Sequence, residues 1–116
     1  MTKTEVLTMV AQLKAHEYSD AVMLRWLEEL EQKIACEIHR KPMSTPAYAS
    51  AAVGEQLSVP APYDRVYWTY LLSMLDFVSG NKEGYELSHA NFKEAYEDYA
   101  RYVQRNNPFS KRRRLR

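Results

Sequence analysis

Apolar residues recur every three or four positions along most of the chain, a spacing that predicts amphipathic helices. The first helix opens at a capping box, in which Thr2 is the N-cap and Glu5 reaches back to it. The second helix has Ser19 as its N-cap and should continue to about Arg40. The apolar positions of the two helices are Val6, Met9, Val10 and Leu13, followed by Met23, Trp26, Leu27, Leu30, Ile34 and Ile38.

A long irregular loop should follow, over about residues 41–61. Pro42, Pro46, Pro60 and Pro62 bound and interrupt this stretch, which is rich in Ala, Ser and Thr, and each proline removes a backbone donor and fixes φ. A loop of this length in a compact domain is either functional or a sign that an element has been missed. Part of it, "GEQLSV", could pair as a strand with a partner, and both interpretations stay open.

The third and fourth helices should form an antiparallel hairpin. Pro62 suits the first turn of the third helix, and Gly80-Asn81 should end it because both residues tolerate the left-handed conformation. The fourth helix should stop before Asn106. The short turn makes the two helices antiparallel neighbours. The sequence thus predicts an all-α, four-helix domain over residues 1–107, followed by a basic C-terminal tail over residues 108–116.

The third helix is apolar around most of its circumference. Only one narrow strip is polar, and the rest carries aromatic and aliphatic side chains, so the helix needs neighbours on more than one face. Some of this surface could contact a second copy of the chain, or all of it could be the aromatic core of a monomer. The candidate subunit-interface residues are Tyr67, Trp68, Tyr70, Tyr96 and Tyr99.

Length and composition place the chain among small cytosolic proteins. A chain of 116 residues is expected to form one domain with a single core. The longest apolar run is too short to span a membrane, and the N-terminus lacks the apolar block of a signal peptide. Cys36 is the single cysteine, so an internal disulfide is impossible and packing must supply the stability.

The near-neutral net charge of +1 hides an uneven distribution. Five of the 16 basic residues lie in the last six positions, so residues 1–110 carry 11 basic and 15 acidic residues, a net charge of −4. This division indicates that the acidic body forms the fold and that the basic tail contacts a partner. The candidate partner-binding residues are Phe109, Lys111, Arg112, Arg113, Arg114 and Arg116.

Two residue pairs have spacings that occur in catalytic or metal sites. Glu86 and His89 form one Glu-x-x-His, but a di-iron site needs a second copy and further carboxylates, which the sequence lacks. Cys36 and His39 could form a thiolate-imidazole pair, yet no third group is positioned in the sequence to orient the base. We therefore expect no enzymatic activity, no metal and no cofactor.

The C-terminal half carries a family resemblance. "VPAPYD" runs into an aromatic helix, and after Gly80-Asn81 the stretch "NFKEAY" and Tyr99 follow. Together with "YSD" and "RWLEELEQKI" in the N-terminal half, these segments resemble small helical head-tail connector proteins of long-tailed double-stranded DNA bacteriophages and prophages. The resemblance covers about residues 1–106 and does not extend to the tail.

The resemblance implies a structural virion protein of the phage neck. It implies a homo-oligomeric ring of twelve copies that docks under the portal protein, extends the channel for packaged DNA and offers a surface to the next neck, stopper or tail component. The protein would be made in the bacterial cytoplasm and end in the virion. The alternative is a small helical nucleic-acid-binding regulator whose basic tail contacts phosphates.

Overall fold

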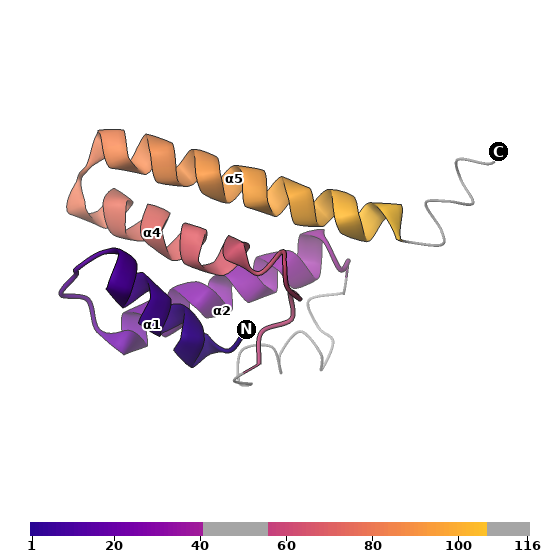
Figure 1. The fold of residues 1–116 in the computed structure, drawn as a ribbon, viewed down its shortest axis with the longest axis horizontal. Coiled ribbons are helices and arrows are strands. Elements are labelled where there is room, and N and C mark those ends of the chain that lie inside the picture. The colour runs from indigo at the N-terminus through magenta and orange to yellow at the C-terminus, as the bar shows by residue number, and fades with distance from the viewer. Residues whose placement is uncertain (41–55, 107–116) are drawn as a thin grey trace.

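The computed structural model describes residues 1–40 and 56–106, which form four helices around one hydrophobic core (Figure 1). With the labels of Figure 1, the helices are α1 (Lys3–Leu13), α2 (Asp20–Glu37), α4 (Arg65–Ser79) and α5 (Lys82–Arg105). The predicted all-α fold is confirmed.

The predicted helix starts and the predicted hairpin turn are also confirmed. Thr2 Oγ1 accepts the Glu5 N–H, and the Glu5 carboxylate accepts the Thr2 N–H at 3.0 Å, which completes the capping box. Ser19 caps α2. Gly80 ends α4 in the left-handed region at φ 78°, where a Cβ would be strained. Asn81 then serves as N-cap of α5, with its side chain accepting the Gly84 N–H at 3.1 Å.

Two predicted helix boundaries were wrong. α2 ends at Glu37 rather than near Arg40, because Ile38 is its C-cap and Arg40 has a φ of 57°, which no right-handed helix accommodates. α4 begins at Arg65 rather than at Pro62. A separate turn precedes it, in which the Tyr63 N–H donates to the Pro60 carbonyl at 2.9 Å.

α4 lies at the centre of the fold and has a helix on three sides. In Figure 1 it runs antiparallel to α5, while α1 and α2 pack on its other side. Val66, Leu71 and Leu75 of α4 are essentially inaccessible to solvent. Complete burial of an aliphatic side chain of this size stabilises a fold by about 1.5–3 kcal/mol. The arrangement therefore depends on apolar burial around α4.

A buried carboxylate fixes the segment that leads into α4. The Glu31 side chain of α2 is 2% exposed and accepts hydrogen bonds from the Ser58 N–H and hydroxyl, both at 3.1 Å. It also accepts a hydrogen bond from the Tyr67 hydroxyl, and the Tyr67 oxygen in turn accepts one from the Val59 N–H at 2.9 Å. These three hydrogen bonds offset part of the cost of burying the Glu31 carboxylate, which without partners would be several kcal/mol.

The predicted strand segment "GEQLSV" is seen from Gln56 onward, and it pairs within the chain. Gln56 forms an isolated antiparallel bridge with Thr2, and the Leu57 N–H donates to the Met1 carbonyl at 3.2 Å. Leu57 and Val59 are buried in the core. Gly54 and Glu55, like the rest of the predicted loop from residue 41, lie outside the described residues.

A second buried carboxylate joins three helices near the hairpin turn. Asp76 of α4 is 5% exposed, pairs with the Lys14 ammonium at the C-cap of α1 and accepts the Ser88 hydroxyl of α5 at 2.8 Å. The Asn81 N–H also donates to the Asp76 carbonyl oxygen at 3.0 Å. These contacts fix α1, α4 and α5 relative to one another at this end of the molecule.

We expect Tyr67→Phe to lower the free energy of unfolding by about 1–3 kcal/mol, because it leaves the Val59 N–H and one acceptor of Glu31 unsatisfied. Urea denaturation followed by circular dichroism measures the change. Tyr70→Phe is the matched control, since the Tyr70 hydroxyl makes no hydrogen bond to another described residue. Equal effects of the two substitutions would contradict a specific role for the buried network.

Candidate functional site

A row of aromatic rings follows the seam between α4 and α5, and we call it the aromatic strip. Phe77 contacts Tyr85 with 5.6 Å between ring centroids, and Tyr85 stacks on His89 at 5.2 Å with an interplanar angle of 18°. Phe92 continues the row and contacts Tyr70 at 5.0 Å. The members of the aromatic strip are Tyr70, Phe77, Tyr85, His89, Phe92 and Tyr96.

α2 covers only one end of the aromatic strip. There, the Tyr96 hydroxyl donates to the Glu37 carboxylate at 2.6 Å, and the Lys33 ammonium lies 5.5 Å from the centre of the Tyr96 ring. Elsewhere within the described residues, the backbones of α2 and α5 do not approach each other closely. The rest of the strip is correspondingly open: Phe92 is buried, but His89 is exposed and Phe77 is 63% exposed.

The open end of the strip contains a hollow with an almost wholly apolar lining. Its volume is about 280 Å³, and it is lined by Asp76, Phe77, Gly80, Asn81, Lys82 and Tyr85. Figure 1 shows that the α4–α5 turn and the α1–α2 connection lie at the same end of the molecule. The six exposed large apolar residues of the described chain come from these helix ends and connections: Leu13, Tyr18, Val22, Phe77, Val78 and Leu87.

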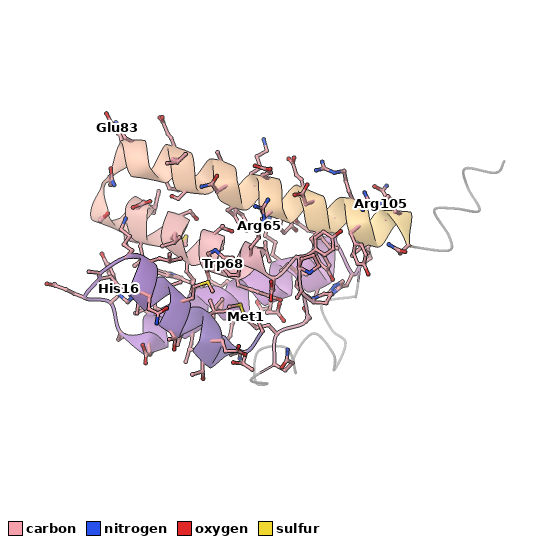
Figure 2. The ribbon with its side chains drawn as sticks, in the orientation of Figure 1. Met1, His16, Arg65, Trp68, Glu83 and Arg105 are labelled. Carbon is pink, nitrogen blue, oxygen red and sulfur yellow. The ribbon has the colours of Figure 1, made fainter. Side chains whose placement is uncertain are left out.

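The structure divides the predicted subunit-interface residues into two groups. Tyr70 and Tyr96 belong to the aromatic strip and are half-buried, as is Trp68, which lies between α4 and α1 in Figure 2. Tyr67 and Tyr99 are 0% and 4% exposed, so the prediction that these two contact a neighbouring copy was wrong. The hydroxyl of each has a partner inside the chain, namely Glu31 for Tyr67 and His39 for Tyr99, at 2.7 Å in the second case.

Four members of the strip were absent from the predicted interface: Phe77, Tyr85, His89 and Phe92. Helical spacing marks Phe77, Tyr85 and Phe92 as apolar positions of the hairpin helices. The helical period cannot tell which apolar side lacks a neighbour, because that depends on where α2 crosses α4. The sequence therefore contains a signal for the rings but none for their exposure.

The residue pairs with catalytic spacing have other surroundings in the structure. His89 stacks between Tyr85 and Phe92, one turn after Glu86. Cys36 is exposed, and a ring nitrogen of His39 lies 2.7 Å from the Tyr99 hydroxyl. Within residues 1–40 and 56–106, no three His, Cys, Asp or Glu side chains are grouped so that they could hold a metal ion.

The candidate tail contacts lie outside the described residues, which end at residue 106. They are Phe109, Lys111, Arg112, Arg113, Arg114 and Arg116. The described part of the chain ends with the C-terminus of α5, at the end of the helix opposite the hairpin turn (Figure 1).

Comparison with known proteins gives no relative: no protein-family model, curated protein or solved structure matches the chain. None of the four described helices combines the length and apolar composition needed to cross a bilayer. Any function must therefore be argued from the surfaces themselves.

Burial shifts the ionisation of several tyrosines. Burial is the largest cause that raises the pKa of Tyr67, Tyr70, Tyr96 and Tyr99 above the ordinary tyrosine value, and a neighbouring carboxylate adds to it in each case. For Tyr67 the carboxylate is Glu31, and for Tyr96 it is Glu37. In the opposite direction, the hydrogen bond from Tyr96, followed by that from Lys33, lowers the pKa of Glu37.

We expect the protein to lose stability in alkaline solution. Because folding raises the tyrosine pKa values, their contribution is complete below the unfolded-state pKa of about 10 and is lost progressively as the pH rises above it. Urea midpoints measured from about pH 8 to pH 11 should fall above pH 10. Tyr67→Phe removes the most deeply buried of these hydroxyls, so it should make the decrease of the urea midpoint above pH 10 smaller. If the decrease is the same in this variant, ionisation of other residues causes it.

Proposed function

We propose that this protein is a structural adaptor of the bacteriophage neck, a homo-oligomeric ring that docks under the portal, extends the DNA channel and links to the next neck or tail component. The supporting observation is the partly exposed aromatic strip, which a monomer leaves in water. An exposed apolar surface of this kind, bordered by charged residues, is typical of protein interfaces.

A ring requires each copy to carry two different complementary surfaces. Such a heterologous contact closes into a ring when its rotation divides the full circle, and it forms a filament otherwise. The aromatic strip supplies one surface, on a single side of the hairpin. A ring needs a second, different surface to cover it, whereas a symmetric pair would bury the strip of one copy against that of the other.

The basic tail supplies a contact to a partner other than the ring. The body, residues 1–110, has a net charge of −4 and the last six residues carry five cations. The acidic body would repel a DNA duplex, so the tail alone would hold phosphates. We assign Lys111, Arg112, Arg113, Arg114 and Arg116 to acidic surface on the portal protein, since the planar guanidinium group binds carboxylates through paired hydrogen bonds.

We expect Phe77→Asp to weaken assembly while leaving the fold nearly intact, because Phe77 is 63% exposed and makes few core contacts. Sedimentation velocity measures assembly, and thermal unfolding measures stability. Phe77→Leu should retain assembly. Leu71→Asp, at a position that is 0% exposed, should abolish folding and assembly together. If the purified chain has the mass of one copy at every concentration, and also when bound to portal protein, the ring is excluded.

Truncation after Asn107 should abolish co-purification with the co-expressed portal protein of the same phage, while helicity and thermal stability stay nearly unchanged. Pull-down from the co-expressing cells measures the first, and circular dichroism the second. A truncated protein that still binds portal, in particles whose genomes leak or are misplaced in the neck, would make DNA the partner of the tail.

The same variant tests the alternative of a nucleic-acid-binding regulator. A regulator should bind free duplex DNA at moderate salt, with an affinity that falls steeply as salt rises, and truncation should remove this binding. Tight duplex binding by the full chain, without any association with portal, would favour the regulator over the adaptor.

A further inference from the structure

α5 presents an acidic outer face on the side away from α4. Exposed residues recur along it at spacings of three and four, which places them in one stripe of the helix surface. Figure 2 shows Glu83 at the hairpin end of this stripe, directed away from α4. The outer face consists of Glu83, Glu86, Leu87, Ala90, Glu94 and Glu97.

The outer face combines unpaired negative charge with one prominent apolar side chain. Glu94 lies 3.8 Å from the Arg65 guanidinium, but Glu83, Glu86 and Glu97 have no ion pair with another described residue. Leu87, at 68% exposed, is the most exposed large apolar residue of the described chain. Leu87 lies beside Glu83 and Glu86 on the helix surface, and within the described residues it remains largely exposed.

The aromatic strip has the opposite charge along its α5 edge. Lys82 lines the hollow next to Phe77 and Tyr85. Lys93 lies one helical turn after His89, four residues along α5, and so borders the strip further down. Neither Lys82 nor Lys93 forms an ion pair within the described residues, although each lies four residues before a glutamate of the outer face, Glu86 and Glu97 respectively.

The opposite edge of the strip, on α2, adds no net charge that would oppose this pattern. Glu29 is the α2 carboxylate whose charge adds to the effect of burial in raising the pKa of Tyr70, and it lies 3.7 Å from the Arg25 guanidinium. Lys33 and Glu37 form a second pair at 3.1 Å. The unpaired cations beside the strip are therefore the two lysines on α5.

We propose that the outer face of α5 in one copy docks on the aromatic strip of the next copy, with Leu87 entering the hollow beside Phe77 and Tyr85. The carboxylates Glu83 and Glu86 then lie near Lys82 and Lys93 of the neighbour. This contact buries the exposed leucine and the exposed phenylalanine together and pairs charges that are unpaired in a single copy.

The occupant must be a second copy if the outer face is to meet the strip at all. Leu87 and the rings of the strip lie on opposite sides of α5, so this leucine cannot reach the rings within one molecule. The contact is heterologous and leaves a free strip at one end and a free outer face at the other, which allows continued addition of copies. The inference rests on the self-association in the proposed function and specifies which surfaces produce it.

Charge reversal on each surface separately gives the decisive variants. Lys82→Glu with Lys93→Glu places acids on both surfaces, and Glu83→Lys with Glu86→Lys places bases on both. Each pair should raise the concentration needed for half-assembly roughly tenfold or more, because like charges face each other across the contact. Thr8→Glu with Gln12→Glu, on the exposed face of α1, is the control for added negative charge and should have no effect.

Mixing the two charge-reversed variants distinguishes the loss of a specific contact from a general loss of folding. When the two charge-reversed proteins are combined in equal amounts, every strip finds an outer face of opposite charge, so assembly should return. The chain that carries all four reversals should also assemble. Circular dichroism of each variant confirms that it is folded, and sedimentation velocity measures assembly. Leu87→Ser should weaken assembly in all backgrounds.

The outcomes separate this inference from the proposed function. If the chain assembles and the charge reversals do not change its assembly, or if mixing does not restore it, the assignment of these surfaces is wrong and the adaptor function stands. If the strip variants lose binding to portal or another neck protein while self-assembly is unchanged, the strip serves that partner instead. A chain that never self-associates, alone or on portal, overturns both.

Discussion

α4 carries large apolar side chains around most of its circumference, so this helix must be covered on several sides at once. α1, α2 and α5 cover three sides, and α2 reaches α5 near Tyr96, whose hydroxyl donates to Glu37 and whose ring lies beside Lys33. The remaining side becomes the aromatic strip. The core and the candidate interface are thus two parts of the same apolar surface, separated by the angle at which α2 crosses α4.

Two buried carboxylates convert this apolar packing into a defined arrangement. Apolar contacts are not directional and tolerate small rotations of a helix, whereas a buried carboxylate needs its donors at fixed positions. Glu31 positions Tyr67 and Ser58, and Asp76 positions Lys14 and Ser88. Because these groups fix both the rotation of α4 and the end of α5, they also determine which aromatic rings face solvent.

The sequence predicted the local features of the fold well, because those depend on neighbouring residues. The capping box at Thr2, the Ser19 cap and the Gly80 turn were all found where the motifs placed them. The sequence failed where distant residues decide. Tyr67 and Tyr70 are equally aromatic and belong to the same helix, yet only Tyr67 meets the Glu31 carboxylate, and that contact spans 36 positions. No periodic pattern contains this information.

The anchoring of residues 56–59 has a consequence for the variation that this chain can tolerate. Leu57 and Val59 are buried in the core, and Ser58 between them donates to the buried Glu31 carboxylate. A charged side chain at either buried position would withdraw the segment from the core and leave Glu31 and the Tyr67 hydroxyl oxygen short of donors. Variation at residues 57 and 59 is therefore confined to apolar side chains of similar size.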